Sequence, residues 1–107
     1  MKTIVLCYGL MITSPVDNLA AWLHAHGARV VMERPVAGAL YVGHSLGAGR
    51  CAAMAAANHG TFIGLDPVPP TGGLVISSAA LGTDHLSVVN DPRSRAIVLR
   101  MARGGHP

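Results

Sequence analysis

Hydrophobic and polar residues divide the chain into two kinds of segment. Short runs rich in apolar residues occupy positions 3–12, 28–32, 39–42, 61–65 and 74–78, bounded by glycine, proline or polar residues. Such runs are typical of strands in a sheet that is covered on both faces. The first run also has the charged start and apolar stretch of a signal peptide, but Gly9 interrupts it and a helix start follows. We therefore favour a strand.

Helical patterns lie between these runs. Ser14, Pro15 and Asp17 predict a helix start, because an N-cap serine, an early proline and an early acidic residue all suit free backbone N–H groups. Apolar residues then recur at helical spacing as far as Gly27, and Asp91 provides a similar cap near the C-terminus. The three predicted helices cover about positions 14–27, 47–58 and 92–104.

Strands that alternate with helices predict a largely parallel sheet, and a chain of 107 residues suffices for a single domain, residues 1–107. One connection is short: about seven residues separate Met32 from Leu40, whereas a parallel crossover usually needs a dozen or more. Because extended chain of that length still reaches about 24 Å, we expect Glu33 to Gly38 to cross back without a helix. One face of the sheet would then be poorly covered, and we expect a homo-oligomer to form through it.

A G-x-S-x-G pattern stands between a predicted strand and a predicted helix; it consists of Gly43, His44, Ser45, Leu46 and Gly47. The sharp turn needs glycines on both sides of the serine, because side chains there would clash with the flanking segments. The Ser45 hydroxyl would project from the carboxyl end of the strand, and the helix N-terminus would offer free N–H groups to an oxyanion. The pattern predicts a serine nucleophile.

The chain resembles the α/β-hydrolase family, and specifically its lipases and esterases, at three places: this elbow motif, Gly64-Leu65-Asp66-Pro67 and Asp84-His85. The resemblance implies acyl transfer to water through a Ser-His-Asp triad. It also implies a reduced α/β-hydrolase fold with three layers and five mostly parallel strands in the order 2-1-3-4-5. The first and last helices would lie on one face and the nucleophile helix on the other. The cap segment of larger members is absent, which favours small acyl esters.

Six histidines compete for the role of base, and His85 alone lies in a loop that enters a helix after the last strand. A serine hydroxyl needs a base to take its proton, and the base needs an acid to fix its tautomer. Asp66 follows the strand beside the nucleophile strand, where catalytic groups collect in parallel sheets. Asp84 is the alternative acid, although its side chain would usually point away from an adjacent histidine. Either aspartate could instead serve only as a turn former.

The backbone N–H of Leu46 and one N–H from the loop after the first strand would form the oxyanion hole. We expect Leu10 to be the second donor, with Met11 as the alternative, because this loop has Tyr8-Gly9 where the family commonly has His-Gly. Tyr8 would either line the pocket or pack as a core tyrosine at the strand end.

Composition argues against several other classes of protein. The net charge is only +3, and the basic residues near the C-terminus lack interleaved aromatics, so no nucleic-acid partner is expected. No apolar run reaches the roughly 18 residues that span a bilayer, so no stable membrane insertion is expected. Zinc-site spacing and phosphate-binding patterns are both missing, so neither a metal nor another cofactor is expected. Cys7 and Cys51 lie in apolar segments, which indicates reduced thiols and a cytoplasmic protein, with secretion as the minority alternative.

The predicted function is a serine hydrolase, esterase-like or lipase-like, that cleaves small acyl esters through an acyl-enzyme. The alternatives are a thioesterase and a non-catalytic binding module on a truncated hydrolase fold. The set of Ser45, Asp66 and His85 favours catalysis, because a domain kept only for binding has no need of all three.

Overall fold

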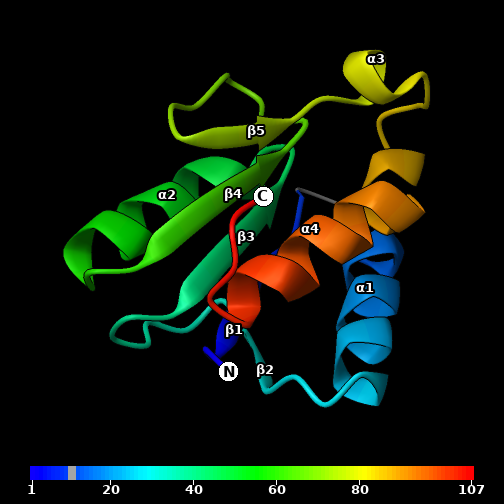
Figure 1. The fold of residues 1–107 in the computed structure, drawn as a ribbon. Helices are drawn as coiled ribbons and strands as arrows, with labels where there is room; N and C mark the ends of the chain where they lie inside the picture. The colour runs from blue at the N-terminus through cyan, green and yellow to red at the C-terminus, as the bar shows by residue number, and fades with distance from the viewer. Residues whose placement is uncertain (10–11) are drawn as a thin grey trace.

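A computed structural model describes residues 1–9 and 12–107 as a small α/β domain built on one sheet. The sheet has the strand order β2-β1-β3-β4-β5, and every neighbouring pair is parallel (Figure 1). The strands are β1 (Ile4–Cys7), β2 (Val30–Met32), β3 (Leu40–His44), β4 (Thr61–Leu65) and β5 (Leu74–Ile76). Both the parallel pairing and the predicted order 2-1-3-4-5 are confirmed.

Helices cover the two faces unequally. The helices α1 (Ser14–Ala25) and α4 (Pro92–Ala102) lie on one face, and α2 (Gly47–Ala57) lies on the other, as predicted (Figure 1). Two short elements were not predicted: α3 (Ser78–Leu81) and the 3-10 helix η1 (Ser87–Asn90). Each has only four residues, too few for an apolar pattern at helical spacing to become visible.

The predicted N-cap is confirmed for α4 and wrong for α1. Asp91 is the N-cap of α4, and its side chain accepts a hydrogen bond from Arg93 N at 2.9 Å, as the sequence predicts. In α1, by contrast, Ser14 already belongs to the helix, and Thr13 is the N-cap without a side-chain hydrogen bond. The predicted serine cap is therefore wrong by one residue, and α1 begins without a capping side chain.

Two apolar clusters hold the layers together. The larger one joins the sheet to α1, α4 and η1 and includes Leu6, Leu23, Val42 and Val98. The smaller one lies between the sheet and α2; its buried members are Val5, Cys7, Ala39, Tyr41, Cys51 and Ala55. Because β1 and β3 are buried along their whole length, both clusters are built around the centre of the sheet.

The crossover from β2 to β3 runs without a helix, as predicted. Its Val36 packs against the smaller cluster, where the Tyr41 hydroxyl accepts a hydrogen bond from Val36 N at 2.8 Å and donates one to Val36 O at 2.6 Å. Extended chain thus covers part of the face that a helix would normally cover. Further along the sheet, Val75 of β5 remains 39% exposed.

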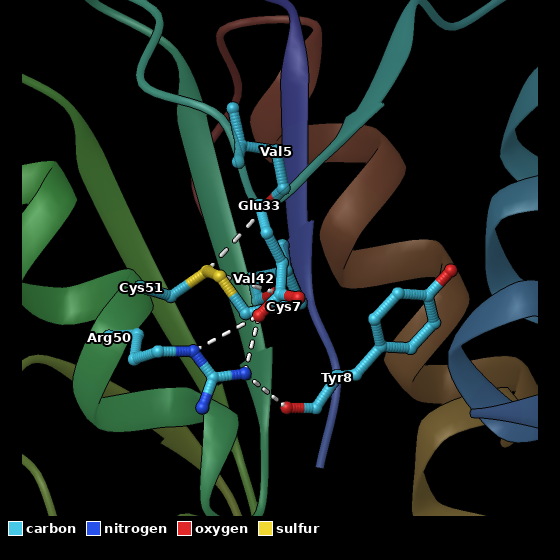
Figure 2. A network of polar contacts seen from close by, with 7 residues as sticks. All are labelled: Val5, Cys7, Tyr8, Glu33, Val42, Arg50 and Cys51. Atoms are coloured by element: carbon cyan, nitrogen blue, oxygen red, sulfur yellow. Dashed lines mark hydrogen bonds and ion pairs between the residues drawn. A yellow bond between two sulfur atoms is a disulfide. The ribbon is translucent and has the colours of Figure 1, made fainter. Parts of the chain in front are cut away.

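Cys7 and Cys51 form a disulfide, so the prediction of two reduced thiols is wrong (Figure 2). Cys7 ends β1 and Cys51 lies on α2; their Cα atoms are 6.0 Å apart although 44 residues separate them in sequence. The sequence could not show this proximity, because it depends on which face of β1 meets α2. The Cys51 sulfur also contacts the Val42 carbonyl oxygen at 3.5 Å, but a disulfide sulfur carries no proton to donate.

Within residues 1–9 and 12–107, no helix combines the length and the apolar character that crossing a bilayer requires.

Candidate active site

Ser45 stands in the tight connection between β3 and α2. Its φ of 56° is in the left-handed region, which costs free energy for a residue with a side chain. Backbone hydrogen bonds hold this conformation: Ser45 N donates to Leu65 O at 3.1 Å, and Ser45 O accepts from Ala48 N at 3.2 Å and Val68 N at 3.0 Å. The serine therefore occupies a strained turn that both β4 and α2 support.

The two glycines of the motif allow close backbone approach, as the sequence predicts. A Cβ atom added to Gly43 would lie 2.5 Å from Ala48 Cα, inside the first turn of α2. A Cβ atom added to Gly47 would overlap the Tyr8 carbonyl group and lie 2.7 Å from its carbon. Neither position could hold a larger residue without moving the elbow or the loop after β1.

Asp66 and His85 meet at the carboxyl end of the sheet. His85 Nδ1 lies 2.9 Å from Asp66 Oδ2, and Ser78 N donates to Asp66 Oδ1 at 2.6 Å. Burial raises the pKa of Asp66, but the hydrogen bonds from Ser78 and His85 outweigh it, so the pKa lies below its ordinary value. An ionised carboxylate only accepts hydrogen bonds, so His85 must hold a proton on Nδ1. In the neutral ring, Nε2 is then left as the acceptor.

Asp84, the alternative acid, is engaged elsewhere. Its Oδ1 accepts hydrogen bonds from Leu86 N at 3.0 Å and Ser87 N at 2.8 Å, and its Oδ2 accepts one from Ser87 Oγ at 2.9 Å. The hydrogen bonds from Ser87 are the main reason why the pKa of Asp84 is lowered. Asp84 therefore shapes the turn that leads into η1, and Asp66 is the carboxylate in contact with His85.

His44 has a contact that its place in the motif did not predict. Its side chain is buried, with Nε2 2.8 Å from the carbonyl oxygen of His85, and the two rings lie 4.8 Å apart between centroids. Burial lowers the pKa of His44, so the ring is neutral at pH 7 and Nε2 donates to that carbonyl. His44 thus ties the elbow to the loop that carries His85. No sequence signal indicates this contact, because the residue before the serine is variable in the motif.

Ser45 and His85 line one pocket of about 260 Å³, whose other walls are Gly9, Ile12, His44, Leu46 and Leu86. His85 also lines a second pocket of about 260 Å³, together with Asp66, Val68 and Val75 among others. A larger pocket of about 430 Å³ lies between α1 and α4 and contains none of the predicted site residues. The pockets at Ser45 and His85 are the ones in which the predicted chemistry could take place, because they contain the predicted nucleophile and base.

Of the two predicted oxyanion donors, Leu46 N lies among the described residues and Leu10 N does not. Leu46 is the N-cap of α2, and within residues 1–9 and 12–107 no acceptor receives a hydrogen bond from its N–H group, which is expected for a backbone donor at a helix start. Leu10 and its alternative Met11 lie outside the described residues. Tyr8 lines neither small pocket; its hydroxyl donates to Asp17 Oδ1 of α1 at 2.6 Å.

No model of a known protein family matches the chain, and neither a curated protein nor a solved structure matches it. Among the residues that the structure describes, no cluster of histidine, cysteine, aspartate or glutamate side chains could hold a metal ion.

Proposed function

We propose that this chain is a serine hydrolase of the α/β-hydrolase type, esterase-like or lipase-like, that cleaves small acyl esters. The single observation that carries the proposal is the contact of His85 Nδ1 with Asp66 Oδ2 at 2.9 Å. His85 lines the same pocket as Ser45. Activation of a serine hydroxyl requires a histidine whose tautomer an acid fixes, and here that histidine lines the same pocket as the strained Ser45.

In the proposed first step, Nε2 of His85 takes the proton of Ser45 Oγ as this oxygen attacks the ester carbonyl carbon. Asp66 stabilises the imidazolium that forms, and it does so without taking the proton itself. The carbonyl oxygen becomes an oxyanion, which Leu46 N stabilises at the start of α2 together with the predicted donor Leu10 N. Each good donor supplies roughly 3 to 4 kcal/mol of transition-state stabilisation.

The tetrahedral intermediate then collapses. The bond between the carbonyl carbon and the alcohol oxygen breaks, His85 gives its proton to the leaving alcohol, and the acyl group stays on Ser45 Oγ. Water attacks this acyl-enzyme by the same route in reverse, with His85 again as base, and releases the carboxylic acid and the free serine. No cofactor takes part in the proposed cycle.

The substrate class follows from the size and lining of the pocket that contains Ser45. At about 260 Å³ it is small, and Ile12, Leu46 and Leu86 give it an apolar lining. A short apolar acyl group fits such a space better than a charged one, because no lysine or arginine lines it to compensate the loss of hydration of an anionic acyl group. Thioesters carry the same acyl groups and are the second substrate class to test.

Intact-mass analysis after incubation with a fluorophosphonate tests the proposal. The reagent adds once to an activated serine, so we expect one adduct on the native chain and none on Ser45→Ala. A folded native chain that stays unmodified would refute the proposed activity and favour a non-catalytic binding module, for which the exposed Val75 on the sheet would be the first surface to test.

The disulfide indicates in which cellular compartment the protein resides. Disulfides persist in oxidising compartments and are rare in the cytosol, so the Cys7–Cys51 bond favours secretion, the minority alternative of the sequence analysis, over the cytoplasm. Thiol alkylation of the protein immediately after cell lysis would separate the two: a cytoplasmic protein would have both cysteines alkylated, and a secreted one neither.

A further inference from the structure

The loop after β1 is tied to α2 by an arginine that the proposed mechanism does not use. Arg50 Nη2 donates a hydrogen bond to Tyr8 O at 3.0 Å, and Arg50 Nε donates to Glu33 Oε1 at 3.0 Å (Figure 2). Nη2 also contacts the same Glu33 oxygen, which makes an ion pair. Arg50 lies three residues after Gly47, so it occupies the side of α2 on which Gly47 meets Tyr8.

Two features of this contact are costly by themselves. Arg50 lies in the first turn of α2, where the helix dipole disfavours a cation. Glu33, immediately after β2, has a φ of 46°, in the left-handed region that a glutamate seldom adopts. The surroundings compensate both: Glu33 N donates to Leu6 O at 2.8 Å, and the Glu33 carboxylate supplies the counter-charge that Arg50 needs. Backbone strain of this kind gathers at functional sites.

The hydrogen bond from Arg50 to Tyr8 O lies next to the wall of the pocket that contains Ser45. The disulfide at Cys7 holds the end of β1 near α2. The Tyr8 carbonyl and the Gly9 N–H belong to one rigid peptide group, so the hydrogen bond from Arg50 sets the direction of both. Gly9 lines the pocket, and a Cβ atom on it would lie only 3.5 Å from Ser45 Cβ.

We propose that Arg50, with Glu33 as its counter-ion, is a positioning residue that sets the Tyr8–Gly9 peptide against Ser45. This inference rests on the proposed function, because it assigns the pair a role in the reaction at Ser45. Arg50 does not touch the reacting atoms. Its effect is to keep the wall beside the nucleophile in the geometry that the transition state needs, where a displacement of about 1 Å can cost roughly a hundredfold in rate.

The test compares the native chain with Arg50→Met, Arg50→Lys and Glu33→Gln by the rate of fluorophosphonate modification and by kcat and KM for p-nitrophenyl acetate. Arg50→Met keeps the apolar stem and loses the guanidinium. We expect modification rate and kcat to fall roughly tenfold to a hundredfold, with KM nearly unchanged. Arg50→Lys, which keeps the charge and one donor to Tyr8 O, should recover part of the rate. Arg34→Met is the matched control, because Arg34 is exposed and makes no hydrogen bond to any residue the structure describes.

The double variant Arg50→Met/Glu33→Gln shows whether the two residues act together. If Glu33 works only through Arg50, Glu33→Gln will slow the native chain but not Arg50→Met. Urea unfolding of every variant separates positioning from folding. If Arg50 had a purely structural role, each variant would lose stability and modification rate in proportion, and Arg50→Lys would recover no more rate than stability. Modification of Arg50→Met at the native rate, with Ser45 still labelled in the native chain, would overturn this inference alone. A native chain that is not labelled would overturn the proposed function and this inference with it.

Discussion

His85 Nδ1 lies 2.9 Å from the carboxylate of Asp66, across 19 residues of sequence, while the adjacent Asp84 turns away to bind Leu86 N and Ser87. The difference decides which tautomer His85 adopts. Asp66 requires a proton on Nδ1, and this leaves Nε2 free to act as a base. The same carboxylate accepts a hydrogen bond from Ser78 N, so α3 holds it in place.

Asp66→Asn should lower kcat by about four orders of magnitude, because an amide that donates to Nδ1 favours the tautomer with the proton on Nε2. The substitution hardly changes volume, so the fold should survive. Turnover of p-nitrophenyl acetate by purified protein measures the effect. Asp84→Asn is the matched control: the amide oxygen still accepts from Leu86 N and Ser87 N, and kcat should fall less than tenfold. Equal losses in the two variants would contradict the assignment of Asp66.

Gly47 and Gly49 lie on the same helix but differ in their surroundings. Gly47→Ala forces a Cβ atom into the Tyr8 carbonyl group, whereas a Cβ atom on Gly49 meets nothing within 4 Å. We expect Gly47→Ala to lower the free energy of unfolding by about 1 to 3 kcal/mol. Gly49→Ala should raise it by about 0.5 to 1 kcal/mol, since alanine loses less backbone entropy in a helix. Urea unfolding measures both, and a stable Gly47→Ala would show that the loop yields easily.

The sequence predicts local features of the fold and the site, but it does not predict contacts between distant parts of the chain. Local patterns predict β4 with its observed bounds, Thr61–Leu65, the Asp91 cap of α4 and the need for glycine at Gly43 and Gly47 of the elbow. What the sequence could not supply depends on distant contacts. The Cys7–Cys51 bond needs the facing of β1 toward α2, and the contact of His44 with the His85 carbonyl needs the path of a loop 41 residues away. Neither leaves a periodic or spacing signal in the chain.

Burial of His44 predicts a specific loss of stability in acid. Its pKa in the folded state is lowered, so the unfolded chain binds a proton that the folded chain resists. The contribution of His44 is therefore complete above the unfolded pKa of about 6.5, and it decreases as the pH falls from there through the lower folded pKa. Urea unfolding between pH 7.5 and 5 should show this decrease. His44→Gln should flatten the curve, whereas His24→Gln, on an exposed helix surface, should leave it unchanged.

Val75 supports a prediction about association. Alternation along β5 sets its side chain on the α2 face, opposite to Leu74 and Ile76, and it is 39% exposed there. If copies of the chain associate through this face, gel filtration with light scattering will give a mass above 11.0 kDa at micromolar concentration. Val75→Lys should return that mass to the monomer, because a charge in the interface would lose its hydration. A monodisperse monomer of the native chain would contradict association through this face.

The disulfide should carry much of the stability of this small domain. Cys7 and Cys51 close a long loop, with a sequence separation of 44 residues, and closure of a loop of that length in the unfolded chain corresponds to about 4 kcal/mol. The double variant Cys7→Ala/Cys51→Ala should lose roughly that amount, as should the native chain in excess reductant. Urea unfolding with and without reductant measures both losses. The reductant should have no effect on the double variant, and a native chain equally stable in both conditions would show that the bond contributes little.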